Sequence, residues 1–265
     1  MAACLIAIVV FLSLAMAFAW SVAIRTGKSG LIDASWSFAV GIAAIAAALW
    51  PLGVGDYGPR RWLIAAFAAA WSARLGLYIF GRSHGPEDDP RYAKLKAEWG
   101  DKAPRQLFIF LQIQAVAGWP LVGAALLAAH APFTGFRLQD GLAVIVFVAS
   151  LIGETIADRQ MARFRGDKKN RGGICEAGLW SWSRHPNYFF EWLGWVAYVL
   201  AAVDFSGGYL LGWASLLAPV VMYVLLVYVS GAPPLEQYLA RSRPAAFADY
   251  ARRVSQFWPL PPART

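Results

Sequence analysis

Four charged residues lie inside otherwise apolar segments of the sequence, where a charge needs a reason to be present. They are Asp33, Arg74, Glu154 and Glu191. A charge at the centre of a bilayer costs roughly 2.5–3.5 kcal/mol on insertion scales, so residues of this kind usually serve a functional site. Arg74 and Tyr78 are four residues apart and share a helix face. The structural alternative is an ion pair between Arg74 and Asp33 that only holds two helices together.

Positive charges gather in the polar segment 158–187. They are Arg159, Arg163, Arg165, Lys168, Lys169, Arg171 and Arg184. A basic segment beside a membrane can simply attract anionic lipid headgroups, at about 1 kcal/mol for each Lys or Arg. The residues around its end argue for more, because His185, Asn187, Tyr188 and Glu191 bring donors, acceptors and a stacking face that headgroup attraction does not require.

A helix that begins at Pro186 would add a site for an anion. Proline fits the first turn of a helix, where its missing N–H costs nothing. The free N–H groups of that turn, beside Arg184 and His185, would hold a negative group, and a phosphorylated nucleotide is the natural ligand. The chain has no G-x-G-x-x-G after a strand and no G-x-x-x-x-G-K-[ST], so neither a Rossmann domain nor a P-loop would hold it.

The composition restricts the class of protein that carries these residues. Of the 265 residues, 58% are hydrophobic and only 15% are charged, with a mean hydropathy of +0.47. A soluble domain is about 45–50% apolar and about 25% charged. The composition therefore excludes a soluble enzyme, a disordered protein and a nucleic-acid module. Cys4 and Cys175 provide neither a zinc set nor a disulfide framework, and we expect no metal.

Seven segments meet or approach the ~20 apolar residues that a spanning helix requires. They are 2–24, 31–55, 62–81, 106–130, 141–157, 188–205 and 209–230. We therefore expect a single all-α transmembrane domain over residues 1–265, with Pro233 and Pro234 ending the last span and a tail at 231–265. The first segment lacks the basic start of a signal peptide, so we expect it to be retained.

The positive charges also predict the orientation. Twenty Lys and Arg residues fall in the tail and in the loops after the first, third and fifth spans, against three on the opposite face, which are Arg60, Arg61 and Arg137. Loops rich in Lys and Arg stay in the cytoplasm. We expect the N-terminus outside and the C-terminus in the cytoplasm.

The motif at the sixth span resembles the membrane-embedded steroid 5α-reductase-like family, including its bacterial relatives. The resemblance is tightest over Gly178-Leu179-Trp180 and Arg184-His185-Pro186-Asn187-Tyr188 with Glu191, and it extends to Asp249-Tyr250 and Trp258-Pro259. It covers the C-terminal part of the chain well and the N-terminal part loosely. Isoprenylcysteine and phospholipid methyltransferases, which bind S-adenosylmethionine, share the Arg-His-Pro-x-Tyr core. Asn187 before the tyrosine, Glu191 after it and the lone Glu236 favour the reductase.

The resemblance implies an NADPH-dependent reduction of the carbon–carbon double bond of a Δ4-3-oxosteroid or a similar enone lipid, in what we expect to be a bacterial inner membrane. Asn187 matches the cofactor-binding Asn of the family. NADPH is favoured over NADH because a 2′-phosphate needs Arg or Lys partners. The predicted cofactor-binding residues are Asp158, Arg163, Arg165, Lys168, Lys169, Asn170, Arg171, Trp180, Arg184, His185, Asn187, Tyr188, Glu191, Glu236 and Tyr250.

The family polarises the substrate carbonyl with a Glu on its second helix and a Tyr on the next. Asp33 and Tyr78 stand near those positions, and we predict them as the catalytic residues, with Asp33 as a neutral acid and Tyr78 as a donor to the ketone. Such donors stabilise the enolate that hydride attack creates. The predicted substrate-binding residues are Trp36, Trp71, Arg74 and Trp119. Ordinary core or interface aromatics are the alternative for the three tryptophans.

Two other functions are compatible with the sequence. The first is a methyltransferase that acts on a lipid or a prenylated thiol with S-adenosylmethionine. The second is a transporter or lipid-binding scaffold, although transporters tend to show inverted repeats and paired broken helices, which the sequence lacks. The expected partners are the enone lipid and the bilayer, with no nucleic acid and no obligate protein partner.

Overall fold

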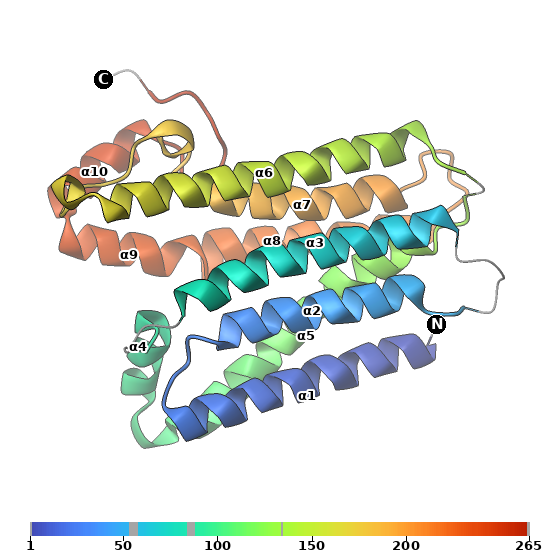
Figure 1. Cartoon of the computed structure of the whole chain (residues 1–265), viewed down its shortest axis with the longest axis horizontal. Helices are drawn as coiled ribbons and strands as arrows, with labels where there is room; N and C mark the ends of the chain where they lie inside the picture. The colour runs from blue at the N-terminus through green and yellow to red at the C-terminus, as the bar shows by residue number, and fades with distance from the viewer. Residues whose placement is uncertain (1, 53–57, 84–87, 134, 264–265) are drawn as a thin grey trace. The chain divides into compact units, whose positions relative to one another are not determined.

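Helices account for all the regular structure in the described residues, which are 2–52, 58–83, 88–133 and 135–263 of a computed structural model. No strand occurs among them. The α-helices, coloured along the chain in Figure 1, are α1 (Ala2–Thr26), α2 (Ile32–Leu49), α3 (Pro59–Arg82), α4 (Pro90–Trp99), α5 (Ala103–Ala129), α6 (Leu138–Gly166), α7 (Pro186–Ala202), α8 (Leu217–Val224), α9 (Ala232–Ser242) and α10 (Pro244–Arg253). Short 3₁₀ turns cover Gly100–Lys102, Lys168–Asn170 and Gly178–Ser181, a longer 3₁₀ helix covers Leu210–Leu216, and a π-helical turn covers Leu225–Val229.

Within the described part of the chain, six helical stretches are long and apolar enough to cross a membrane. They are Ala2–Thr26, Ile32–Leu49, Pro59–Arg82, Arg91–Ala129, Leu138–Gly166 and Leu210–Ser242. The expected span 188–205 corresponds to α7, which starts at Pro186 and has 17 residues. The chain is therefore a multi-pass, all-helical membrane protein. The count of seven spans and the direction of the termini stay predictions.

Several boundaries differ from those expected. Helix α2 ends at Leu49, short of residue 55, because Pro51 disfavours the helical conformation at Trp50; residues 53–55 lie outside the described part. Helix α6 continues past residue 157 to Gly166, so the polar segment 158–187 begins within a helix. Hydropathy marks only the apolar part of a helix and misses such a polar extension.

Contacts between residues divide the chain into two compact units. The first contains Met1–Arg137 and Tyr198–Ala218, and the second contains Leu138–Ala197 and Pro219–Thr265. Helices α1 to α5 thus belong to the first unit. Helix α6, most of α7 and the chain from Pro219 onward form the second.

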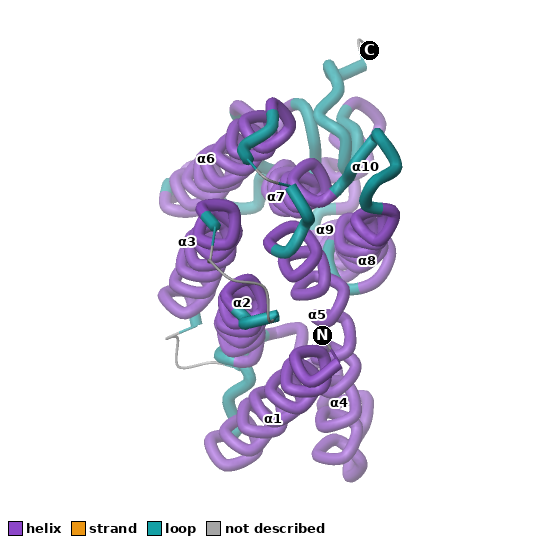
Figure 2. The backbone as a smooth tube through the Cα atoms, turned by 90° about the vertical axis from the view of Figure 1, so that its right-hand side faces the viewer, coloured by secondary structure: helices purple, strands orange, loops and turns teal. Residues whose placement is uncertain are grey.

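Small residues bring the helices of the first unit close together. Gly41 of α2 lies against Ser72 of α3, whose hydroxyl donates to the Ser37 carbonyl over 3.1 Å. Gly76 of α3 lies beneath the ring of Phe38. Helix α5 packs against α1, α2 and α3 (Figure 2). Small residues are the usual device of membrane helices, because lipid tails are as apolar as leucine and only close packing favours contact.

Two arginines close the C-terminal end of α7. Arg60 donates to the Ala201 carbonyl over 3.1 Å, and Arg137 donates to the carbonyls of Ala201 over 2.8 Å and Val203 over 2.9 Å. Both guanidinium groups lie over the ring of Phe133, at 5.0 and 3.5 Å from its centre. The last carbonyls of a helix lack partners within it, and these cations satisfy them.

The second unit is built on the contact between α6 and α7. Gly153 lies against the ring of Phe190, and an added Cβ at Gly194 would meet the Ser150 hydroxyl at 3.1 Å. The C-terminal segment joins this pair through aromatic rings, since the ring centre of Trp258 lies 5.2 Å from that of Trp192. The rest of the chain after α8 is therefore anchored to α7.

The close approach at Gly41 makes a prediction about stability. Gly41→Ala places a methyl group against the Ser72 side chain, and overpacking of this kind costs about 1–3 kcal/mol. Gly123→Ala on α5 is the matched control, because its added Cβ meets nothing within 4 Å and alanine favours a helix. We expect thermal unfolding in detergent to show a lower Tm for Gly41→Ala alone. Equal Tm changes in both variants would contradict this account of the packing.

Candidate functional site

Glu236 of α9 gathers the two basic residues that precede α7. Arg184 donates to both carboxylate oxygens, from Nε over 2.8 Å and from Nη2 over 3.3 Å, and His185 Nε2 lies 3.0 Å from Oε1. The side chain of His185 is buried, and those of Arg184 and Glu236 are less than one-fifth exposed. Gln256 adds a weaker bond to Glu236 over 3.4 Å. A two-pronged guanidinium–carboxylate pair fixes geometry as well as charge.

Arg184 also holds the C-terminal segment. Its Nη1 donates to the carbonyls of Val254 over 2.8 Å and Ala251 over 3.2 Å, and its main-chain N–H donates to the Ser255 carbonyl over 2.8 Å. The guanidinium is therefore engaged by Glu236 and two carbonyls. Arg184 lies beside the start of α7, as the sequence predicts. Its observed contacts hold the C-terminal segment and α9 against the turn before α7.

Tyr250 and Trp180 fix the turn before the motif. The Tyr250 hydroxyl donates to the Trp180 carbonyl over 2.6 Å, and the Trp180 indole donates to the Ala157 carbonyl of α6 over 3.0 Å. Burial raises the pKa of Tyr250 well above its usual value, so the hydroxyl keeps the proton that it donates. Gly178, with φ +60, lies against Gln160, whose amide oxygen accepts from the Leu179 N–H. Tyr250 and Trp180, which the sequence predicts to bind the cofactor, therefore support the turn before α7 through bonds within the protein.

The first turn of α7 carries an amide oxygen without a partner. Asn187 Oδ1 is buried and accepts no hydrogen bond from any described residue. Buried polar atoms are nearly always satisfied, so each exception needs an explanation such as a missing water or ligand. Beside it, the rings of His185 and Tyr188 stack, with centres 5.3 Å apart and planes 8° apart.

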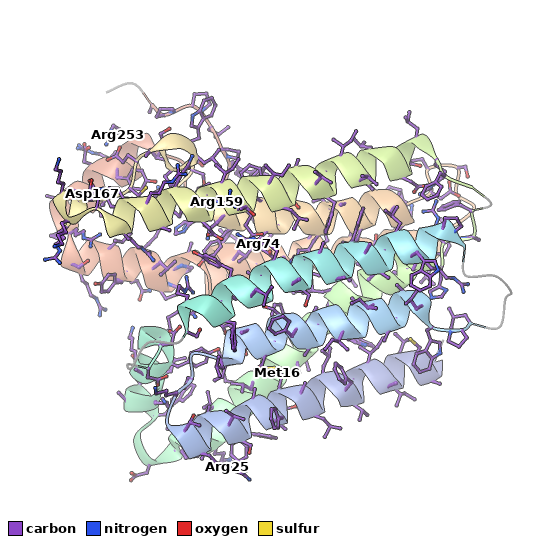
Figure 3. The ribbon with its side chains drawn as sticks, viewed as in Figure 1. Met16, Arg25, Arg74, Arg159, Asp167 and Arg253 are labelled. Atoms are coloured by element: carbon purple, nitrogen blue, oxygen red, sulfur yellow. The ribbon has the colours of Figure 1, made fainter. Side chains whose placement is uncertain are left out.

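The predicted phosphate-binding cations lie in the last turn of α6 and in the turn that follows it. Arg163, Arg165, Lys168, Lys169 and Arg171 are all exposed, and within the described part of the chain none of them forms an ion pair. Asp167, which follows α6 (Figure 3), caps the next turn by accepting from the Lys169 N–H. Asn170, a predicted cofactor residue, donates its side-chain amide to the Phe164 carbonyl over 3.0 Å. All five cations therefore face solvent.

Two predicted acidic residues are buried within the second unit. Asp158 on α6 and Glu191 on α7 are 6% and 5% exposed. Glu191 accepts from the Trp195 indole over 3.1 Å. Asn187 and Glu191 are four residues apart and share one face of α7. All fifteen predicted cofactor residues belong to this unit.

Asp33 of α2 forms the polar centre of the first unit. Its Oδ2 accepts from Arg91 over 2.6 Å and its Oδ1 accepts from the Tyr92 hydroxyl over 2.7 Å. Gln114 of α5 donates to the same hydroxyl over 3.4 Å. Both partners of Asp33 donate to its carboxylate oxygens, and the arginine in contact is Arg91 rather than Arg74.

Tyr78 lies near two other arginines of its own helix. The guanidinium carbons of Arg74 and Arg82 lie 5.3 and 5.6 Å from the centre of its ring, as the spacing of four residues predicts. Two positive charges therefore lie beside the aromatic ring of Tyr78. Figure 3 shows Arg74 on α3.

The predicted substrate-binding tryptophans divide into two groups. Trp36 and Trp71 meet edge to face, with ring centres 6.3 Å apart, and the Trp36 indole donates to the Gln114 carbonyl over 2.9 Å. Trp71 is buried, whereas Trp119 is 43% exposed. Packing thus brings Trp36 and Trp71 together near Asp33, while the exposure of Trp119 is that of an interface aromatic.

Sequence reasoning missed the residues that surround Asp33. Arg91 and Tyr92 lie on α4, a short helix that the apolar pattern does not reveal. The start of α4 could have been recognised from the sequence, because Asp89 is a typical N-cap residue and a proline follows it at the first helical position. In the structure, Asp89 accepts from the Arg91 N–H over 2.9 Å. Gln114 gives no such signal, because a lone amide in an apolar helix does not indicate its partner.

Comparisons with known proteins show the family to which this chain belongs. A sequence model of the family described as protein of unknown function, DUF1295, matches residues 19–254. The chain belongs to the DUF1295 family. Every predicted site residue lies within this DUF1295 region. An uncharacterized protein of Schizosaccharomyces pombe is 24% identical over 268 aligned residues, which cover 91% of this chain and 75% of the relative. No solved structure matches.

The bond between Arg184 and Glu236 makes a prediction for this DUF1295 protein. Arg184→Lys keeps the charge but loses the fork that reaches both carboxylate oxygens and two carbonyls. We expect the free energy of unfolding to fall by about 1–3 kcal/mol, measured by thermal or chemical unfolding in detergent. Arg252→Lys is the control, because Arg252 is exposed and pairs with Asp249 at the surface. An unchanged Tm for Arg184→Lys would remove this cluster from the account of the fold.

Proposed function

We propose that this protein reduces the carbon–carbon double bond of an enone lipid, such as a Δ4-3-oxosteroid, with NADPH, in a bacterial inner membrane. NADPH, when bound, supplies the hydride that adds to the β-carbon of the enone. The chain must then hold the cofactor and stabilise the negative charge that develops on the carbonyl oxygen.

The observation that carries the proposal is the unpartnered amide oxygen of Asn187. A nicotinamide carries a carboxamide whose N–H groups can donate to such an oxygen. Asn187 lies on the first turn of α7, directly after Arg184 and His185, which Glu236 holds in place. The unsatisfied acceptor therefore fits a ligand with an amide donor, in a motif that resembles the cofactor motif of the reductase family.

The exposed cations at the end of α6 support the choice of NADPH over NADH. Arg163, Arg165 and Lys169 are free of ion pairs with described residues, so their charge remains for a phosphate. A 2′-phosphate is the feature that distinguishes the two cofactors. Arg184 keeps a different role in the proposal, because it positions the turn that bears Asn187.

Tyr78 is the proposed donor to the ketone. Arg74 and Arg82 place two positive charges beside its ring. The Tyr92 proton, by contrast, is committed to Asp33. Asp33 accordingly becomes a positioning residue, which joins α4 to α2, instead of an acid that touches substrate.

The first test of the proposal is NADPH consumption by the detergent-purified protein with and without a Δ4-3-oxosteroid, with the product identified by mass. We expect a product about two mass units heavier, and a loss of activity in Asn187→Ala, because the amide acceptor is gone. Gln237→Ala is the control, since Gln237 is an exposed amide outside the predicted site and activity should persist.

Other results would contradict the proposal. If several enones are left unreduced while S-adenosylmethionine binds saturably, the protein is a methyltransferase, and the cations at the end of α6 serve that cofactor. Equal affinity for NADH and NADPH would refute the phosphate-reading role of those cations. Full activity in Asn187→Ala would remove this residue from the cofactor site.

Two phenylalanine substitutions separate the roles of the tyrosines. Tyr78→Phe removes the proposed donor, so turnover should fall by about 10²–10³-fold while NADPH affinity changes little. Tyr92→Phe removes the bond to Asp33, so it should lower Tm and change the turnover of folded protein far less. Steady-state kinetics and thermal unfolding on both variants give the answer. The reverse pattern would transfer the catalytic role to Tyr92.

A further inference from the structure

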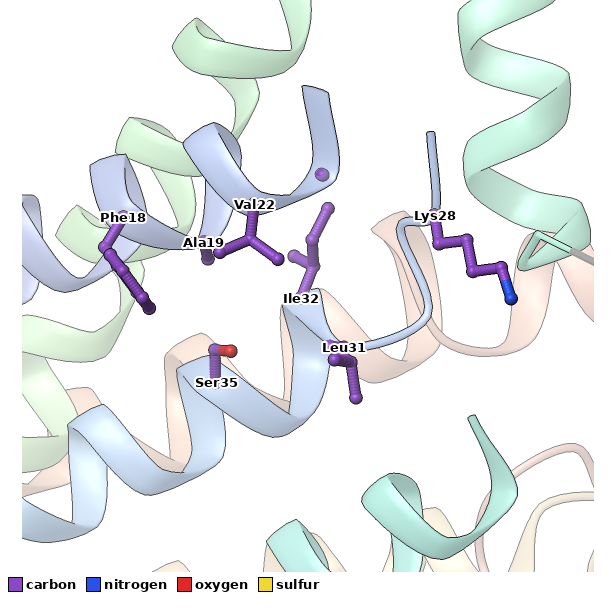
Figure 4. A pocket seen from close by; sticks show the side chains of 8 residues that line it. Phe18, Ala19, Val22, Lys28, Leu31, Ile32 and Ser35 are labelled. Carbon is purple, nitrogen blue, oxygen red and sulfur yellow. The ribbon is translucent and has the colours of Figure 1, made fainter. Parts of the chain in front are cut away.

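A groove of about 270 Å³ lies between α1 and α2 and contains none of the predicted site residues. Its walls are apolar and consist of Phe18, Ala19, Val22, Ala23, Leu31 and Ile32. Ser35 and Lys28 complete the lining. Figure 4 shows side chains of the two helices facing one another, with Lys28 extending to one side of them. The groove thus has an apolar body and a single charged end.

The segment that presents Lys28 is held from several directions. Helix α1 ends at Thr26 and the chain reverses at Gly27, whose φ of +72° favours glycine. Lys96 of α4 donates to the Gly27 carbonyl over 3.1 Å and pairs with Asp88 over 2.6 Å. Asp88 in turn accepts from the Ser29 N–H over 2.5 Å. The loop on either side of Lys28 is therefore anchored.

The charge on Asp88 supports this anchoring. Burial acts to raise the pKa of its carboxyl, but the hydrogen bonds from Lys96 and from the Ser29 N–H outweigh burial, and the pKa is lowered. The carboxylate stays ionised near neutral pH and keeps both bonds. On the far side of the loop, the Ser83 hydroxyl donates to the Gly30 carbonyl over 2.6 Å.

Lys28 itself takes no part in these side-chain bonds. Its side chain is exposed and has no acidic partner in the described part of the chain. Arg25, in the last turn of α1, is likewise exposed and unpaired there. An ordered loop thus holds an uncompensated positive charge at the end of an apolar groove. Ordering the loop in advance lowers the cost of binding.

We propose that this groove binds one anionic phospholipid, with an acyl chain between α1 and α2 and the phosphate at Lys28. The apolar walls fit hydrocarbon, and the ammonium complements the phosphate. Phosphatidylcholine also carries a phosphate, but its choline cation offsets that charge, so its attraction to Lys28 is weaker. This site is independent of the proposed reductase activity, and its test uses no turnover.

Native mass spectrometry of the full chain measures the bound lipid directly. The protein is titrated with palmitoyl-oleoyl phosphatidylglycerol and, separately, with the phosphatidylcholine of the same chains. We expect one tightly bound phosphatidylglycerol and weaker binding of phosphatidylcholine. Lys28→Gln should weaken the phosphatidylglycerol about fivefold, the factor expected for one basic residue. Lys94→Gln is the matched control, because Lys94 is also exposed and pairs with Glu98 over 3.7 Å.

A second pair of variants tests the apolar part of the groove. Ser35→Leu fills the space between the helices and should displace the lipid, whereas Ser35→Ala leaves the groove open and should retain it. Equal binding of the two lipids, or equal binding by the wild type and Lys28→Gln, would overturn the proposal in favour of a neutral occupant. Equal weakening by Lys94→Gln would replace it with diffuse attraction to the headgroups.

Discussion

A carboxylate that accepts from an arginine and from a second donor organises each of the two units. Asp33 holds Arg91 and Tyr92, and so joins the short helix α4 to α2. Glu236 holds Arg184 and His185, and so joins α9 to the turn that begins α7. In both places a segment that is too polar to be held by packing in lipid is tied to a helix by charge-assisted hydrogen bonds, which are about twice as strong as neutral ones. The candidate sites are found where these bonds are made.

The stacked His185 and Tyr188 show how this arrangement leads toward function. Because Glu236 fixes His185, the first turn of α7 is ordered before any ligand arrives, and Asn187 is presented at a defined position with its amide oxygen unsatisfied. Preorganised groups of this kind cost nothing further when a ligand binds. The same logic applies to the loop around Lys28, where the anchors are Lys96, Asp88 and Ser83.

The sequence predicted those features that follow from local pattern. Apolar length located the helices, and Pro186 marked the start of α7 because proline suits a first turn. The spacing of Arg74 and Tyr78 placed them on one face. Pairings between distant segments could not be derived in this way. The partner of Asp33 is a residue on a helix that hydropathy does not detect. Arg184 and Glu236 are 52 residues apart in the sequence, which is beyond the reach of a periodic signal.

The two arginines at the end of α7 affect how the predicted difference in Lys and Arg between the two membrane faces is interpreted. Arg60 and Arg137 are two of the three basic residues on the sparsely charged face, and both are directed at the carbonyls of Ala201 and Val203. The C-terminal end of a helix carries a partial negative charge, so these cations are largely neutralised where they stand. The predicted difference in positive charge between the two faces is therefore larger than a count of residues suggests, and Arg60 and Arg137 mark the helix end that they close.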